Sequence, residues 1–176
     1  MGAIIFIVDT LLQLALFVVL ARLLLQWARA DFRNPICQAV VRATNPLILP
    51  LRRILPPVGK VDTASVVAVI IVATIYVAVI SALSGAGLPG PFVWVRTVVL
   101  EIVRTMLTTY FWAIFIYALL GLIAPGGYSP MQSVLSSVCE PVLRPIRRVI
   151  PALAGIDLSP LWACIAIQAV LILLRY

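Results

Sequence analysis

The segments Pro50-Leu-Arg-Arg-Ile-Leu-Pro56 and Pro145-Ile-Arg-Arg-Val-Ile-Pro151 repeat one motif at a distance of 95 positions. Seven residues of each copy match without a gap. The first copy carries Pro35, Pro46, Pro50, Arg52, Arg53, Pro56 and Asp62, and the second carries Pro130, Pro141, Pro145, Arg147, Arg148, Pro151 and Asp157. Each copy lies between two long apolar runs. A proline-rich, basic segment framed by hydrophobic spans is therefore the repeating unit of this chain.

The composition indicates a membrane protein. Hydrophobic residues make up 64% of the 176 residues, charged residues only 11%, and the mean hydropathy is +1.18. A soluble domain has about 25% charged residues, so this chain cannot cover itself with a polar surface. Most of the net charge of +7 lies beside apolar spans. We interpret these basic residues as headgroup anchors and topology signals, and we expect no nucleic-acid partner.

Four apolar stretches approach the ~20 residues that a helix needs to cross a bilayer. They are residues 3–27, 64–83, 105–124 and 158–174, the last being the shortest. This pattern predicts an all-α membrane protein with four transmembrane helices in two tandem, parallel two-span repeats. We assign residues 1–83 to the first repeat, 84–104 to a connector and 105–176 to the second repeat. Residues 92–104 could form an interfacial helix or could extend the third span.

An amphipathic helix is predicted inside each repeat, between its two spans. Asn34 and Ser129 are good N-cap residues, and Pro35 and Pro130 follow at the first helical position, where a missing N–H is tolerated. Apolar residues then recur at helical spacing in the same register in both copies. Each helix should therefore bury one face, on the membrane surface or against the spans.

The later prolines predict where these helices end. Pro46 and Pro141 should stop them, because proline removes a donor and clashes with the preceding turn. A kinked basic loop should follow, lying at the interface or covered by protein, because freed backbone groups are costly in hydrocarbon. Asp62 is expected to cap the second span. Asp157, or Ser159 followed by Pro160, is expected to cap the fourth.

The distribution of positive charge predicts the topology. Nine of the thirteen Lys and Arg residues lie in the loops 28–63 and 125–159. The positive-inside rule places both loops in the cytoplasm and therefore both termini outside. Two spans per repeat make the repeats parallel, so that both basic loops should lie on the same membrane face.

The pattern resembles the YggT family of small bacterial membrane proteins, also called the YlmG family, with relatives in plastids. The resemblance covers nearly the whole chain. It rests on Arg22, Trp27, Asn45-Pro46, Glu140-Pro141, Pro50–Pro56, Pro145–Pro151 and Asp157-Leu-Ser-Pro160. It implies a bacterial inner (plasma) membrane protein with four spans in tandem two-span units. Members have been linked to osmotic-stress tolerance and ion homeostasis, to cell division and, in plastids, to cytochrome assembly.

Residues suited to catalysis are scarce. The chain contains no histidine, the commonest general base and haem ligand. Its six acidic residues are scattered, without helical spacing that would pair two of them. Three cysteines without a C-x-x-C pair indicate neither a disulfide framework nor a zinc site. We therefore expect no enzymatic activity, no cofactor and no metal site.

The arginine pairs are the strongest candidates for a functional role. A guanidinium binds phosphate and carboxylate through two parallel hydrogen bonds. The candidate set for binding anionic lipid or an acidic partner is Arg52, Arg53, Arg147, Arg148, Arg144 and Lys60. The alternative is that these residues serve topology alone. Two intramembrane polar residues stand apart, Arg22 and Glu140, and Arg22 is expected to extend toward Glu140 or Asp62.

Two functions are compatible with these features. The first is a non-catalytic membrane scaffold or assembly factor whose cytoplasmic basic face binds anionic lipid headgroups or a membrane protein partner, including copies of itself. The second is a small transporter or channel-forming subunit in ion or osmotic homeostasis. Transporters usually show an acid or a broken helix at the mid-depth of a span, and the four predicted spans lack both, which favours the scaffold.

Overall fold

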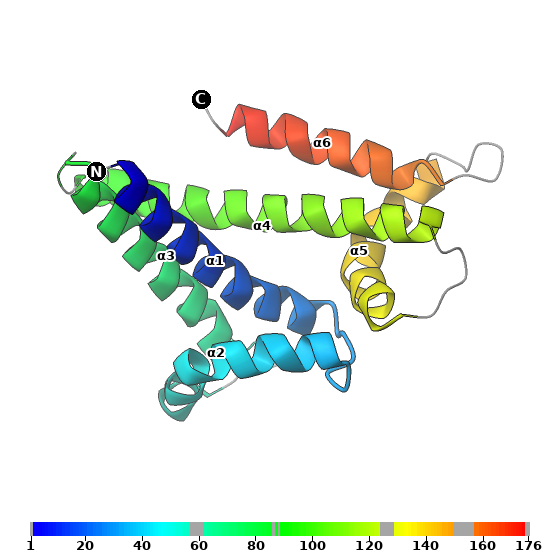
Figure 1. Cartoon of the computed structure of the whole chain (residues 1–176), viewed down its shortest axis with the longest axis horizontal. Coiled ribbons are helices and arrows are strands. Elements are labelled where there is room, and N and C mark those ends of the chain that lie inside the picture. Colours follow the sequence, from blue (N-terminus) through cyan, green and yellow to red (C-terminus); the bar gives the residue numbers. More distant parts are fainter. Residues whose placement is uncertain are drawn as a thin grey trace. The chain divides into compact units, whose positions relative to one another are not determined.

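The computed structural model describes residues 2–56, 62–85, 87, 89–123, 129–149 and 157–174. These residues form helices and connecting segments without a strand (Figure 1). The helices, in chain order, are α1 (Gly2–Trp27), α2 (Pro35–Ile54), α3 (Thr63–Leu83), α4 (Pro91–Ile123), α5 (Pro130–Val149) and α6 (Ser159–Leu173). The all-α prediction is therefore confirmed for this part of the chain.

The chain divides into two compact units. Unit 1 comprises Met1–Leu23 and Val40–Met106, and unit 2 comprises Leu24–Ala39 and Leu107–Tyr176. Helices α1, α2 and α4 contribute residues to both units, because the division falls within each of them.

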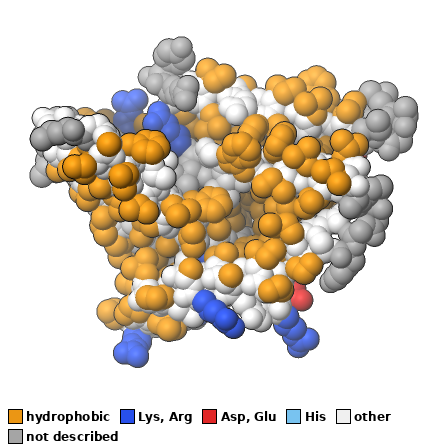
Figure 2. Space-filling model, in the orientation of Figure 1, with side chains coloured by type: hydrophobic (Ala, Val, Ile, Leu, Met, Phe, Trp, Pro, Cys, Tyr) orange, Lys and Arg blue, Asp and Glu red, His pale blue; other side chains and the backbone are white. Residues whose placement is uncertain are grey.

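Three helices are long and apolar enough to cross a membrane, namely α1, α3 and α4. Helix α6 is apolar but has only 15 residues, fewer than the ~20 that a span needs. Hydrophobic side chains cover most of the molecular face in Figure 2. Phe6, for example, leaves 70% of its surface exposed and Phe92 leaves 81%. This surface identifies a membrane protein, whereas the four-span arrangement stays a prediction.

Residues 92–104 belong to a continuous helix. They form the first part of α4, which runs without a break from Pro91 to Ile123 (Figure 1). The 33 residues of α4 give a helix of ~50 Å. A hydrocarbon core is only ~30 Å thick. Of the two alternatives for this segment, an extension of the third span agrees with the observed helix.

Both amphipathic helices begin at the predicted residues. Helix α2 begins at Pro35, and the Asn34 side-chain oxygen accepts a hydrogen bond of 2.9 Å from the Ile36 N–H. Helix α5 begins at Pro130, and the Ser129 hydroxyl accepts one of 3.1 Å from the Gln132 N–H. In both copies the residue before the proline therefore satisfies an N–H that the first helical turn leaves unpaired.

The predicted ends of these helices were wrong. Helix α2 continues through Pro46 and Pro50 to Ile54, and α5 continues through Pro141 and Pro145 to Val149. The two prolines of each helix are four residues apart, so they lie on one face, and all four are exposed. The carbonyls that lose a donor therefore face outward, where water or headgroups can solvate them. That solvation offsets part of the cost of proline inside a helix.

The opposite face of α5 packs into the core of unit 2. Cys139 and Leu143 are fully buried and lie in one cluster with Ile114 of α4 and Ala163 of α6. Burial raises the pKa of the Cys139 thiol to about 12, so that it stays protonated and acts as a small apolar residue. The predicted amphipathic character is thus confirmed, with one face of α5 against other helices and the proline face open.

Candidate functional site

The first arginine of each pair binds the motif aspartate ten residues later. In unit 1, Arg52 Nη2 lies 2.5 Å from Asp62 Oδ2. In unit 2, Arg147 Nε lies 2.7 Å from Asp157 Oδ2. Each ion pair joins the last turn of an amphipathic helix to the residue at or just before the start of the following apolar helix. The two copies of the motif therefore form equivalent contacts, which explains why the arginine and the aspartate recur together.

The aspartates also make contacts at the starts of α3 and α6. The predicted cap of α6 was wrong, because Leu158 rather than Asp157 or Ser159 is its N-cap residue. Asp62 is the N-cap residue of α3, and its carboxylate accepts a hydrogen bond of 2.7 Å from the Ser65 hydroxyl rather than from a backbone N–H. The Asp157 carboxylate accepts a bond of 2.9 Å from the Ser159 N–H, at the first residue of α6. The connection before α3 is further closed by Thr63, whose hydroxyl donates to the Pro56 carbonyl at 2.8 Å.

Arg147 holds a second carboxylate. Its Nη1 lies 2.6 Å from Oε1 of Glu140, which is seven residues earlier on α5. Burial lowers the pKa of Arg147, but hydrogen bonds to Glu140, Asp157 and Tyr117 outweigh burial and raise it. Burial also raises the pKa of Asp157, but its bonds to Ser159 and Arg147 hold that pKa below the ordinary value. Both groups therefore stay charged at neutral pH.

The second arginine of each pair has a different environment. Arg53 and Arg148 are exposed, as is Arg144 one turn earlier on α5, and none of them pairs with an acid among the described residues. They lie in the outward-facing parts of α2 and α5, close to the exposed prolines. Two further members of the predicted set, Lys60 and Pro151, fall outside the described residues. Each pair thus combines one structural arginine with one available arginine.

Arg22 is buried near the end of α1 and bonds to α2. Only 2% of its surface is exposed. Its Nη1 donates to Thr44 Oγ1 at 2.8 Å, to Asn45 Oδ1 at 2.9 Å and to the Val41 carbonyl at 3.3 Å. The hydrogen bonds of Arg22 go to the neighbouring helix α2, while the expected approach toward Glu140 or Asp62 stays a prediction. All three bonds come from Nη1, and the buried Nε of Arg22 has no hydrogen-bond partner among the described residues.

The second copy replaces this contact by another. Tyr117 and Glu140 occupy the positions equivalent to Arg22 and Asn45. In unit 1 the charged residue is Arg22 of α1, and α2 supplies the neutral acceptors Thr44 and Asn45. In unit 2 the acid lies on the amphipathic helix and binds Arg147. Asn45 therefore has a structural role, because it accepts a hydrogen bond from a buried arginine.

One polar contact in unit 1 was not predicted. The Tyr76 hydroxyl of α3 donates to Asp9 Oδ1 of α1 at 2.8 Å, and the Gln13 amide donates to the Tyr76 oxygen at 3.2 Å. The two helices run side by side in Figure 1. Tyr76 is the one tyrosine of α3, and Gln13 is a polar residue inside a predicted span; both were signals in the sequence, because such residues often hydrogen-bond between helices.

Together these features define a helical membrane protein with a duplicated amphipathic helix. In each copy an arginine–carboxylate pair joins the amphipathic helix to the start of the next apolar helix. The chain belongs to the CCB3/YggT family, whose model matches residues 1–83 and 97–176. The two matched segments leave out 84–96, most of the predicted connector, and the family resemblance seen in the motif is confirmed.

Relatives match over almost the whole chain. An uncharacterized protein of Pseudomonas aeruginosa is 40% identical over 170 residues, covering 96% of this chain and 86% of the relative. The uncharacterized protein YggT of Escherichia coli strain K12 is 35% identical over 161 residues, covering 92% and 83%. An uncharacterized protein of Vibrio alginolyticus is 37% identical, covering 96% and 91%. No solved structure matches the chain.

Proposed function

We propose that this protein is a non-catalytic scaffold or assembly factor of the bacterial inner membrane that binds anionic lipid headgroups through α2 and α5. The carrying observation is that the second arginine of each pair is exposed on the open side of an amphipathic helix and pairs with no acid among the described residues. Arg53 and Arg148 hold these equivalent positions. Each cation near an anionic surface contributes ~1 kcal/mol, so several would orient both helices on the membrane.

The exposed prolines support the same placement. Carbonyls that have lost a helical donor are costly in hydrocarbon and favourable among headgroups and water. The proline faces of α2 and α5 are therefore suited to the interface, while their buried faces rest on other helices. With the positive-inside rule, the proposed orientation has four spans, both basic loops in the cytoplasm and both termini outside.

Removing the two available arginines should reduce the enrichment of anionic lipid around the protein several-fold. The test uses the Arg53→Gln, Arg148→Gln double variant in vesicles of phosphatidylcholine containing brominated phosphatidylglycerol, which quenches nearby tryptophan. Wild-type quenching should exceed the level for random mixing and should fall as salt screens the charges. The double variant should approach random mixing.

A matched control removes an ion pair without changing the net charge. The Arg52→Gln, Asp62→Asn variant should keep the wild-type lipid enrichment, because those two charges already neutralise each other. If the Arg53→Gln, Arg148→Gln variant also keeps full enrichment, the arginines serve topology alone and the proposed role is wrong.

A second candidate is a small transporter or channel-forming subunit acting in osmotic or ion balance. The contact among Asp9, Gln13 and Tyr76 supports this candidate, because polar residues within spans often line the pathway of an ion or substrate. Asp9 lies only about two turns from the start of α1, which suits a contact between helices near the interface equally well. Ion flux in proteoliposomes that disappears in Asp9→Asn would favour this second function.

A further inference from the structure

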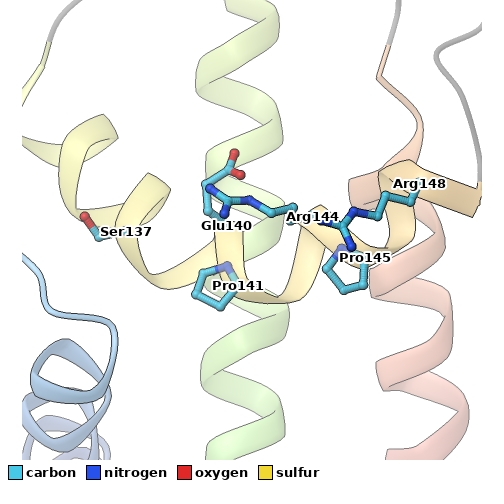
Figure 3. A pocket seen from close by; sticks show the side chains of 6 residues that line it. All are labelled: Ser137, Glu140, Pro141, Arg144, Pro145 and Arg148. Atoms are coloured by element: carbon cyan, nitrogen blue, oxygen red, sulfur yellow. The ribbon is translucent and has the colours of Figure 1, made fainter.

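A groove of about 450 Å³ lies along the outward face of α5 (Figure 3). Its lining consists of Ser137, Glu140, Pro141, Arg144, Pro145 and Arg148. These positions recur at helical spacing, so they share one face of the helix. The groove is open to the surroundings, and one helix alone supplies its lining. All lining residues belong to unit 2, and the groove lies opposite the face that packs on α4 and α6.

The groove carries two positive charges that its own acid does not neutralise. Glu140 is already paired with Arg147 at 2.6 Å. Arg144 and Arg148 are exposed and pair with no acid among the described residues. They are four residues apart, one helical turn, and Figure 3 shows both side chains extending along α5 toward its N-terminus. Two neighbouring guanidinium groups are suited to hold one phosphate through charge-assisted hydrogen bonds.

The same face also offers backbone acceptors. Proline has no N–H, so Pro141 and Pro145 remove the donors that the helix would give to the carbonyls of Ser137 and Pro141. Ser137, Pro141 and Pro145 all line the groove. A phosphodiester by itself brings acceptors only and cannot satisfy these carbonyls. A ligand with hydroxyl groups beside its phosphate can.

We infer that this groove binds the headgroup of a phospholipid that joins a phosphodiester to free hydroxyl groups, as phosphatidylglycerol does. The phosphodiester lies between Arg144 and Arg148, and the glycerol hydroxyls donate to the freed carbonyls. This inference rests on the proposed lipid-binding function and adds selectivity for one headgroup chemistry. The exposed position of the face is consistent with access from the surrounding lipid.

The first copy of the motif lacks this combination. At the equivalent positions α2 carries Arg42, Asn45 and Leu49 in place of Ser137, Glu140 and Arg144. Its prolines and Arg53 are retained. The remaining cations, Arg42 and Arg53, are eleven residues apart, ~16 Å along the helix, which is too far for one phosphate. We therefore expect α2 to attract anionic lipid generally and α5 to select among anionic lipids.

The test compares retention of phosphatidylglycerol, phosphatidic acid and phosphatidylcholine of equal chain length, by native mass spectrometry of protein released from mixed-lipid nanodiscs. Phosphatidic acid has at least as much negative charge but no glycerol hydroxyl, so charge alone does not favour phosphatidylglycerol. Wild type should retain phosphatidylglycerol about tenfold better than phosphatidic acid. Arg144→Leu, which copies Leu49 of the first motif, should abolish most of this preference.

Arg42→Leu is the matched control, because it removes one exposed charge from α2 and should keep the preference. Arg144→Lys should keep the charge attraction and weaken the preference, because lysine lacks the planar fork. Helix content by circular dichroism confirms that each variant is folded. Equal retention of the two anionic lipids by wild type, or a preference that survives Arg144→Leu, would overturn the selective site alone. Retention of neither anionic lipid above phosphatidylcholine would overturn the proposed function as well.

Discussion

Replacing Arg147 with glutamine is expected to lower Tm more than any other single change in the two arginine pairs. The substitution leaves Glu140 and Asp157 without the cation that lies 2.6 and 2.7 Å from them. Breaking a fully buried pair costs about 3–5 kcal/mol. Arg147 is 34% exposed, so solvent screening reduces this, and we expect about 2 kcal/mol, or roughly 4–8 °C in Tm. Thermal unfolding in detergent measures it.

The neighbouring arginines supply the controls. Arg52→Gln should cost about half as much, because Arg52 pairs with a single carboxylate and is 42% exposed. Arg148→Gln and Arg53→Gln should stay within about 0.5 kcal/mol of wild type, as expected for exposed residues without an ion pair. Adding Glu140→Gln to Arg147→Gln should recover part of the loss. If Arg148→Gln destabilises as much as Arg147→Gln, the division of each pair into a structural and an available arginine is wrong.

Replacing Arg22 with alanine is expected to have the largest effect within unit 1. The side chain is 2% exposed and donates three hydrogen bonds to α2, so its removal leaves a cavity and loses the contacts to Thr44 and Asn45. Large-to-small changes at buried sites cost about 2–5 kcal/mol. We expect about 3 kcal/mol here, because removing a buried cation also removes its desolvation cost. Thermal unfolding in the same detergent measures the loss.

Arg96→Ala is the matched control for this substitution. Arg96 is exposed on α4, and its loss should leave Tm nearly unchanged. The Arg22→Ala, Asn45→Ala double variant should cost less than the sum of the two single variants, since both remove the same bond. The expected loss of stability corresponds to a Tm shift of several degrees. If the Tm of Arg22→Ala instead lies within about 1 °C of wild type, the α1–α2 contact contributes little to stability.

The repeated motif predicted much of this architecture. Asn34 and Ser129 were recognised as N-caps because capping depends on a few local residues, and both helices begin after them. The pairing of Arg52 with Asp62, and of Arg147 with Asp157, was visible as an identical ten-residue spacing but was not recognised. The chain leaves one helix and enters the next within those ten residues. The spacing therefore matches neither helical nor strand periodicity, and these are the patterns that indicate contacts between nearby residues.

The prolines show why the helix ends could not be predicted from single residues. Pro46 and Pro141 each disfavour a helix, yet a second proline four residues later places both on one open face. The effect depends on which face is buried, and that is decided by packing against other helices. The contacts of Arg22 could not be predicted for a similar reason. Its partners lie on α2, 19 to 23 residues further along the chain, and no sequence pattern indicates that these residues lie next to Arg22.

The proposed function requires both available arginines to face the same aqueous compartment, and cysteine labelling in cells tests that requirement most directly. Arg53→Cys and Arg148→Cys are introduced separately after Cys37, Cys139 and Cys164 have been replaced by alanine. A membrane-impermeant thiol reagent is then applied to intact cells and to inside-out vesicles. Both positions should react in the vesicles and neither in intact cells. Reaction of either position from the outside of intact cells would contradict a shared cytoplasmic basic face.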